Sequence, residues 1–208
     1  MRLFRSEYTT NRTLNLGSST FTCWYNSGNA WYSNGNNFTV NPGTSNIVLS
    51  ATHGGLQNYN AGINLYDVSY TSLTGEGFYR NAGPAHHITF SAGANMQNSW
   101  ATIAKVSVAG HANIYHGSYN IAELILNSTA AIHNGGNTFG SVQMKGNATV
   151  NGNNEFGTLE LWPGKTYTFQ SGVTQTFTGN LIAVGNCFEP INIQSSSAGS
   201  QAIFSKSG

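Results

Sequence analysis

Acidic side chains are the first candidates for chemistry, because glycoside-cleaving enzymes and calcium sites need carboxylates in pairs or clusters. The chain has one aspartate and six glutamates: Asp67, Glu7, Glu76, Glu123, Glu155, Glu160 and Glu189. None stands in a D-x-D or paired-carboxylate motif. In the 18-residue register described below, Glu123 aligns with Lys105, so we expect a surface charge pair there and no catalytic residues.

Histidines are the second source of acid–base and metal chemistry. The chain has six: His53, His86, His87, His111, His116 and His133. His116 and His133 fall one position apart in neighbouring repeats, and His86-His87 opens an earlier repeat, so two imidazoles could approach one ion. Histidines in polar, Asn-rich turns more often serve as hydrogen-bonding residues. We therefore predict no metal site and no cofactor.

Aromatic rings form the third set, because sugars stack on flat ring faces. The candidate ligand contacts are Trp24, Trp31, Trp100, Tyr115 and Trp162. Alternation from Phe21 and Cys23 places Trp24 on the outside. For any single ring, covering the core at a corner is the favoured role. A Ser-His-Asp site has no support, because the chain lacks a G-x-S-x-G motif.

These residues stand in a chain that repeats itself about every 18 residues from His86 to Leu161. The first apolar column has spacings of 18, 18, 18 and 17 and consists of Ile88, Val106, Leu124, Val142 and Leu159. A second column follows two residues later, and small alanines recur at Ala94, Ala112, Ala130 and Ala148. Apolar and polar residues alternate within each copy, which is typical of strands with one buried face.

A unit this short cannot bury its apolar face alone, so successive copies must stack like residue over like residue. The prediction is an all-β, single-stranded parallel β-helix, or β-solenoid. Hairpins of an ordinary β-sandwich would not keep five columns at constant spacing. A right-handed coil is favoured by the general handedness of parallel crossovers. The hexapeptide pattern of left-handed coils fails at Trp100, Ser118, Gly136 and Asn154.

The earlier part of the chain carries a similar signature with a longer period. Pairs of apolar residues begin at Leu14, Phe38, Ile63 and Ile88, which predicts coils of about 25 residues that narrow to about 18. Residues 1–13 remain an unassigned lead-in, and residues 14–208 are predicted to form one continuous solenoid. Inward residues are expected at Tyr167, Phe169 and Phe177. The chain ends without a polar cap, so we expect it to be a fragment of a longer protein.

The two cysteines, Cys23 and Cys187, are separated by about nine predicted coils. A disulfide allows at most ~7 Å between its Cα atoms, whereas nine stacked coils span about 40 Å. We predict two unpaired thiols, each buried or partly buried.

Composition narrows the functional classes. Charged residues are 7% of the chain and the net charge is +1, so no electrostatic footprint for nucleic acid is present. No apolar run is long enough for a membrane-spanning segment, and MRLFRSEYTT lacks the core of a signal peptide. An uncharged, Asn-rich, aromatic-containing chain is nevertheless typical of export. We expect a secreted or cell-surface location and a signal segment outside this sequence.

Several phrases carry a family resemblance: RTLNLGSSTFT at 12–22, NNFTVNPGTSNIVLS at 36–50, NEFGTLEL at 154–161 and SGVTQTFTGNL at 171–181. They resemble the repetitive secreted surface proteins of Bacteroidetes-type bacteria from residue 12 onward. The resemblance implies a β-helical stalk or adhesin-like region within a larger exported protein. It brings no defined ligand and no binding residues.

We therefore predict a non-catalytic structural or adhesive β-solenoid segment of an exported bacterial cell-surface protein, in weak contact with glycans. Its expected partners are a surface polysaccharide or a cell-surface protein. The alternative is a carbohydrate-active enzyme or a dedicated glycan-binding module on a pectate-lyase-like β-helix.

Overall fold

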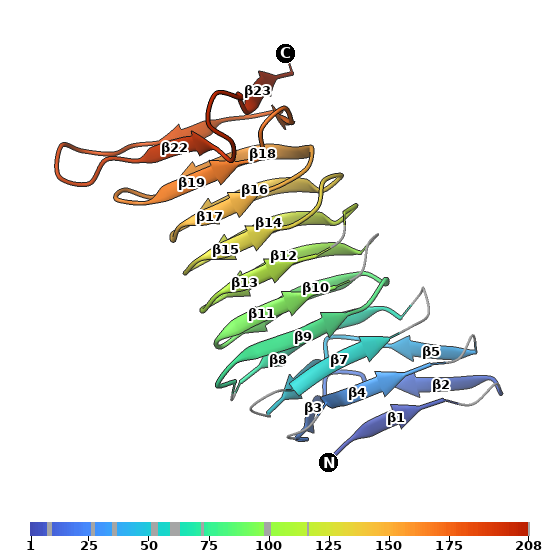
Figure 1. The fold of residues 1–208 in the computed structure, drawn as a ribbon. Coiled ribbons are helices and arrows are strands. Elements are labelled where there is room, and N and C mark those ends of the chain that lie inside the picture. The colour runs from blue at the N-terminus through green and yellow to red at the C-terminus, as the bar shows by residue number, and fades with distance from the viewer. Residues whose placement is uncertain are drawn as a thin grey trace.

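The computed structural model is a stack of parallel strands wound along one axis, from the N-terminus at one end to the C-terminus at the other (Figure 1). It describes residues 1–7, 10–25, 28–34, 37–50, 54–58, 63–71, 73–97, 101–115 and 117–207. Every regular element within these ranges is a strand, and no helix there could cross a membrane. The predicted all-β solenoid is confirmed.

The strands of the first half are β1 (Phe4–Ser6), β2 (Arg12–Asn15), β3 (Thr20–Cys23), β4 (Gly28–Ser33), β5 (Phe38–Asn41), β6 (Asn46–Leu49), β7 (Gly54–Asn58), β8 (Leu65–Tyr70), β9 (Glu76–Arg80), β10 (Ala85–Phe90) and β11 (Gly93–Met96). Those of the second half are β12 (Thr102–Val108), β13 (Ala112–Ile114), β14 (Asn120–Leu126), β15 (Ala130–Ile132), β16 (Thr138–Met144), β17 (Ala148–Val150), β18 (Asn154–Leu161), β19 (Thr166–Phe169), β20 (Thr174–Phe177), β21 (Leu181–Ala183), β22 (Asn192–Ser195) and β23 (Ile203–Lys206).

Two long parallel sheets enclose the core. The first has the order β1-β4-β7-β9-β11-β13-β15-β17-β19-β22, and the second β3-β6-β8-β10-β12-β14-β16-β18-β20-β23, with β21 also pairing β18. A third, short sheet of β2 and β5 lies in the first coils. Up to β18, each coil therefore adds one strand to each long sheet, and after β18 both β20 and β21 pair with it.

The repeated coils follow the predicted columns residue by residue. Ile88, Val106, Leu124, Val142 and Leu159 stand in direct register, and all are fully buried. Each long strand also bends, because two consecutive outward residues separate two buried ones. In β12 these are Ala104 and Lys105, between buried Ile103 and Val106. We call the outward pair the corner of the coil.

Coil length changes along the axis. In the first sheet each coil is shorter than the one before it, as the successive partners Phe4, Trp31, Leu56, Tyr79 and Met96 show. The length is then constant through the partners Met96, Ile114, Ile132 and Val150. The last coil, from Phe169 to its partner Ser195, is longer again. The predicted narrowing is confirmed, and the coils widen near the C-terminus.

The predicted register of the wide coils is wrong. The column of Ile88 runs back through Val68, Ile47 and Phe21, and not through Ile63. Leu14 pairs with Val40 in the separate short sheet. The structure also assigns part of the lead-in, because β1 is the first strand of the ten-stranded sheet.

Larger side chains fill the wider coils. The Trp31 ring stacks on Phe4 with centroids 4.0 Å apart and meets the edge of Phe21 at 5.7 Å. Tyr70 stacks on Phe90 at 4.4 Å. The narrow coils are filled mainly by Ile, Val, Leu and Ala. Tyr167, Phe169 and Phe177 are buried as predicted, and buried rings also stand in the narrow coils at Tyr119, Phe139 and Phe156.

A buried amide ladder crosses three coils in the C-terminal half. Asn137 Nδ2 donates to Asn154 Oδ1 at 2.8 Å, and Asn154 Nδ2 donates to Gln175 Oε1 at 3.3 Å. The Asn137 and Asn154 amides also donate to the carbonyls of Asn134 and Asn151. Because buried polar groups are costly when unpaired, this ladder fixes the axial register of the coils.

Both cysteines are unpaired, as predicted. Cys23 is buried, and its burial raises the pKa of the thiol to about 11. Cys187 is exposed, which corrects the expectation that it would be at least partly buried.

Candidate functional site

Two of the predicted contact rings lie on one edge of the solenoid. Trp24 follows Cys23, and Trp162 follows Leu161. The register links these two preceding residues through the column Cys23, Leu49, Tyr70, Phe90, Val108, Leu126, Met144 and Leu161. Trp24 and Trp162 therefore occupy the same position in coils seven steps apart, which places them about 34 Å from each other along the axis at ~4.8 Å per step.

Both rings are accessible, with exposed fractions of 47% for Trp24 and 40% for Trp162. Each also carries a cation. The Arg2 guanidinium lies 5.3 Å from the Trp24 ring centroid, and the Lys145 ammonium lies 4.9 Å from that of Trp162. A cation beside an aromatic face restrains the ring and adds hydrogen-bond donors next to it. We call Trp24, Trp162 and the residues between them in this column the aromatic edge.

The residues between the two rings are small or polar. They are Ser50, Thr71, Ser91, Ala109, Asn127 and Lys145. Their backbone amides donate to the preceding coil, as Ser50 N does to Cys23 O and Lys145 N to Leu126 O. Backbone hydrogen bonds therefore hold the aromatic edge in a fixed line, with one tryptophan ring at each end.

The remaining three candidates do not lie on this edge. Trp31 is fully buried in the first coils, so the expectation of a surface ring there is wrong. The cause is an irregularity in the pairing of β4 between Asn29 and Trp31, which turns both Ala30 and Trp31 inward and breaks the alternation. Tyr115 is half-buried on the first sheet. Trp100 lies outside the described residues.

Tyr115 belongs to a polar network on the outer face of the ten-stranded sheet. Its ring stacks on His133 at 4.1 Å with an angle of 5°. His133 Nε2 lies 2.9 Å from Asn113 Oδ1, and Asn113 Nδ2 donates to Glu76 Oε1 at 2.7 Å. Desolvation, followed by the charge of His111, lowers the pKa of His133. The network holds Tyr115 in place, so this ring is a structural part of the sheet surface.

Three of the described glutamates have side-chain partners. Lys105 Nζ lies 2.9 Å from Glu123 Oε2, so the predicted charge pair is confirmed. Glu76 accepts from Asn95 as well as from Asn113. Glu7 pairs with Arg5 at 2.6 Å. These carboxylates are engaged in contacts along the surface.

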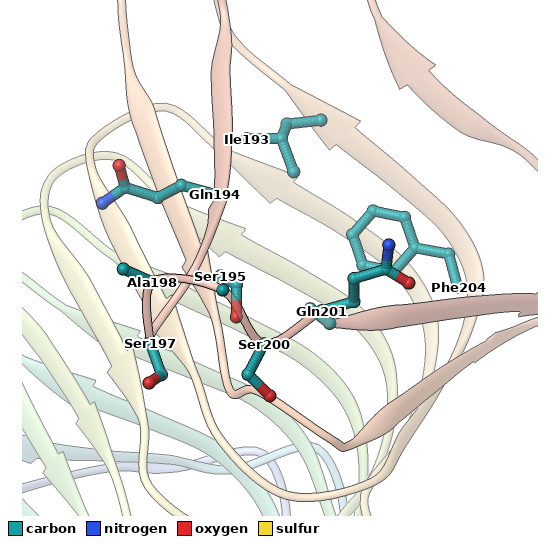
Figure 2. A pocket seen from close by; sticks show the side chains of 10 residues that line it. Ile193, Gln194, Ser195, Ser197, Ala198, Ser200, Gln201 and Phe204 are labelled. Atoms are coloured by element: carbon teal, nitrogen blue, oxygen red, sulfur yellow. The ribbon is translucent and has the colours of Figure 1, made fainter.

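Several hollows lie on the described surface, among them one of about 260 Å³ beside Trp162, and two others are lined largely by hydroxyl and amide groups. One, of about 690 Å³, lies at the C-terminal end between β22 and β23, where Ile193, Gln194, Gln201 and Phe204 surround it (Figure 2). The described residues of its lining bring hydroxyls, amides and apolar groups, with no acidic or basic side chain. The other, of about 330 Å³, lies on the ten-stranded sheet among Thr129, Thr149, Thr166 and Thr168. Both can offer hydrogen bonds, and neither brings a pair of described carboxylates together.

Comparisons with known proteins add no relative to this picture. No family model, curated protein or solved structure matches the chain. The likeness to surface proteins of Bacteroidetes-type bacteria stays a prediction from the quoted phrases.

Proposed function

We propose that the chain is a non-catalytic structural or adhesive solenoid segment of an exported cell-surface protein, and that its aromatic edge contacts an extended polysaccharide. The observation that carries this proposal is the placement of Trp24 and Trp162, two exposed rings with adjacent cations, on one edge and seven coils apart. A ligand that touches both rings must be a polymer longer than about 34 Å.

The chemistry of the edge suits a neutral or acidic sugar chain. Sugar rings stack on indole faces, and the neighbouring Arg2 and Lys145 offer hydrogen bonds to hydroxyls or carboxylates. Each contact alone is weak. Two contacts on one polymer, repeated over many protein copies at a cell surface, multiply the retention through effective concentration.

The interior supports a role without catalysis. The coils are filled by buried side chains, so ligands meet only the outer faces and the two ends of the stack. The described carboxylates of Glu7, Glu76 and Glu123 are held by Arg5, Asn95 and Lys105. Glycoside cleavage needs an acid and a second carboxylate across the bond, and none of the seven carboxylates of the chain stands in a paired-carboxylate motif.

The test is retention on a panel of immobilised polysaccharides, followed by competition with fragments shorter and longer than the spacing of the two rings. We expect Trp24→Ala and Trp162→Ala each to weaken retention and the double variant to lose at least about tenfold. Long fragments should compete far better than short ones, because only they reach both rings.

Tyr32→Ala is the matched control, since its ring also has a neighbouring cation, Arg5 at 5.6 Å from the ring centroid, but lies on β4 of the ten-stranded sheet. It should leave retention unchanged, and circular dichroism should show an intact fold in every variant. Unchanged retention in the double variant would refute the role of the edge. Polymer breakdown by the unmodified protein would favour the alternative of a carbohydrate-active enzyme.

A further inference from the structure

Three side chains with metal-binding atoms meet at one corner of the second long sheet. Asp67 on β8 pairs directly with His87 on β10, and His86 precedes it. Their ligand atoms all lie within 4.8 Å of one another, and they form the one such cluster of three in the described part of the chain.

The bend of the strand explains why both histidines face outward. Consecutive residues of a flat strand point to opposite faces. In β10, however, Ala85 and Ile88 are buried, whereas His86 and His87 between them are not. The register supports a break here, because Ala85 pairs with Ile103 and His87 with Lys105 while His86 is skipped. The corner thus presents two adjacent imidazoles on the same side.

The distances bring both rings to one carboxylate oxygen. His86 Nδ1 lies 3.0 Å and His87 Nδ1 lies 3.9 Å from Asp67 Oδ1. The two imidazole rings stack with centroids 3.9 Å apart, and Tyr66 stacks on His86 at 4.3 Å. The tyrosine orients the His86 ring, as supporting residues do around metal ligands.

Two imidazole nitrogens and one carboxylate oxygen are a ligand set for a divalent first-row transition ion. Donor atoms around a tetrahedral ion at ~2.0–2.1 Å lie about 3.3 Å apart. The His86–Asp67 distance is already within reach, and His87 Nδ1 is about 0.6 Å too far from Asp67 Oδ1. Because an imidazole nitrogen binds a metal in the plane of its ring, the two stacked rings, whose planes differ by 19°, must also rotate to share one ion. Exposed side-chain fractions of 33% to 44% allow an ion to enter directly from solvent.

The nearest basic side chain along the corner does not oppose an ion strongly. Lys105 is the register neighbour of His87 in the next coil. Its ammonium lies 2.9 Å from Glu123 Oε2, so the Glu123 carboxylate offsets its charge. Along the corner, the negatively charged Asp67 is thus followed in successive coils by His87, by the positively charged Lys105 and by the negatively charged Glu123.

We propose that Asp67, His86 and His87 bind one divalent transition-metal ion of the Zn²⁺ class, with the remaining positions open to water or an external ligand. This proposal departs from the prediction of no metal site, and it does not depend on the proposed function. Sequence reasoning considered His86 and His87 but did not place Asp67 beside them.

The experiment is isothermal titration calorimetry of the full chain with ZnCl₂ after removal of metals by a chelator. We expect one ion per chain for the unmodified protein. Asp67→Asn should weaken binding at least about tenfold, and the double variant His86→Gln/His87→Gln should abolish it. Titration with Co²⁺ should give visible absorption bands of a low-coordinate ion, which the double variant should lose.

His111→Ala and His133→Ala are the matched controls, because these histidines lie on the other sheet, and both should bind as the unmodified protein does. The proposal is overturned if the unmodified chain binds no Zn²⁺. It is equally overturned if the double variant retains the ion, or if only the control variants lose it. Should the double variant fail to fold, Asp67→Asn decides between the outcomes, since its side chain keeps the same shape.

Discussion

The wide N-terminal coils and the narrow repeated coils are built from the same strands but filled in different ways. In the wide coils, buried aromatic rings such as Trp31, Tyr70 and Tyr79 occupy the centre. In the narrow coils, columns of identical or similar aliphatic residues stack directly, as Ala112, Ala130 and Ala148 do. Narrow coils also hold some buried rings, such as the stacked pair Phe139 and Phe156, so aliphatic stacking predominates there without excluding aromatic residues.

The difference also concerns the surface. The Asp67–His86–His87 corner and Trp24 lie on coils that are longer in the second sheet than the repeated ones. The narrow coils carry regular outward residues and the Lys105–Glu123 pair. Distinctive side chains therefore lie on both kinds of coil, because Trp162 and the stacked pair Tyr115 and His133 belong to the regular ones.

The largest expected effect is the loss of the Trp31 ring. Trp31→Ala should destabilise the protein by about 3–5 kcal/mol, because it leaves a large cavity beside Phe4 and Phe21. Coils of a solenoid depend mainly on their neighbours, so the N-terminal coils should unfold before the rest. Labelling of Cys23 in a Cys187→Ser background, during urea unfolding, measures this opening.

Two variants sharpen that result. Trp31→Phe keeps a ring and removes an indole N–H that finds no acceptor among the described residues, so it should cost much less. Leu124→Ala in the narrow coils should cost about 2–5 kcal/mol without early exposure of Cys23. Equal Cys23 labelling in Leu124→Ala and Trp31→Ala would show that the two regions unfold as one unit.

A smaller effect is expected at the corner. Ala104, Ala122 and Gly140 hold the same corner position in successive coils, and a β-carbon at Gly140 would lie 2.5 Å from the Ala122 carbonyl oxygen. Gly140→Ala should therefore destabilise the fold by about 1–3 kcal/mol through strain in the tight coils. Ala104→Gly is the reverse control and should cost under about 1 kcal/mol. Thermal unfolding that ranks Ala104→Gly as the worse variant would contradict this account.

The smallest effect concerns pH. The pKa of His133 is lowered from its ordinary value of 6.5 by desolvation and by His111. The folded state then binds this proton less readily than the unfolded state does. The contribution of His133 to the free energy of unfolding is therefore highest above pH 6.5, and it decreases as the pH falls from 6.5 through the pKa of His133 in the folded state. His133→Gln should lose less stability between about pH 7 and about pH 5 than the unmodified protein. Identical pH profiles would remove His133 as the cause.

Most of the narrow region could be predicted from the sequence, because stacking places like residues over like residues. The column from Ile88 to Leu159 and the pairing of Lys105 with Glu123 follow directly from constant spacing. In such coils one repeat predicts the next, and a single register accounts for both the core and the surface.

The wide region could not be predicted in the same way. Alternation marks a strand but does not tell to which sheet it belongs, so the predicted column wrongly includes Leu14 and Ile63. The long period expected for the wide coils would align Asp67 with Ala92, whereas the shorter observed coil places it beside His87. The irregular pairing at Ala30 likewise turns Trp31 inward against the simple alternation.

Because each coil pairs only with its neighbours, the chain behaves as a molecular ruler. The metal-binding corner proposed on β8 and β10 and the ring of Trp162 after β18 are held at a distance set by the number of coils between them. Duplicating residues 104–121 would insert one more 18-residue coil and lengthen the solenoid by ~4.8 Å. Such an insertion would change the spacing of the two features and leave each of them intact.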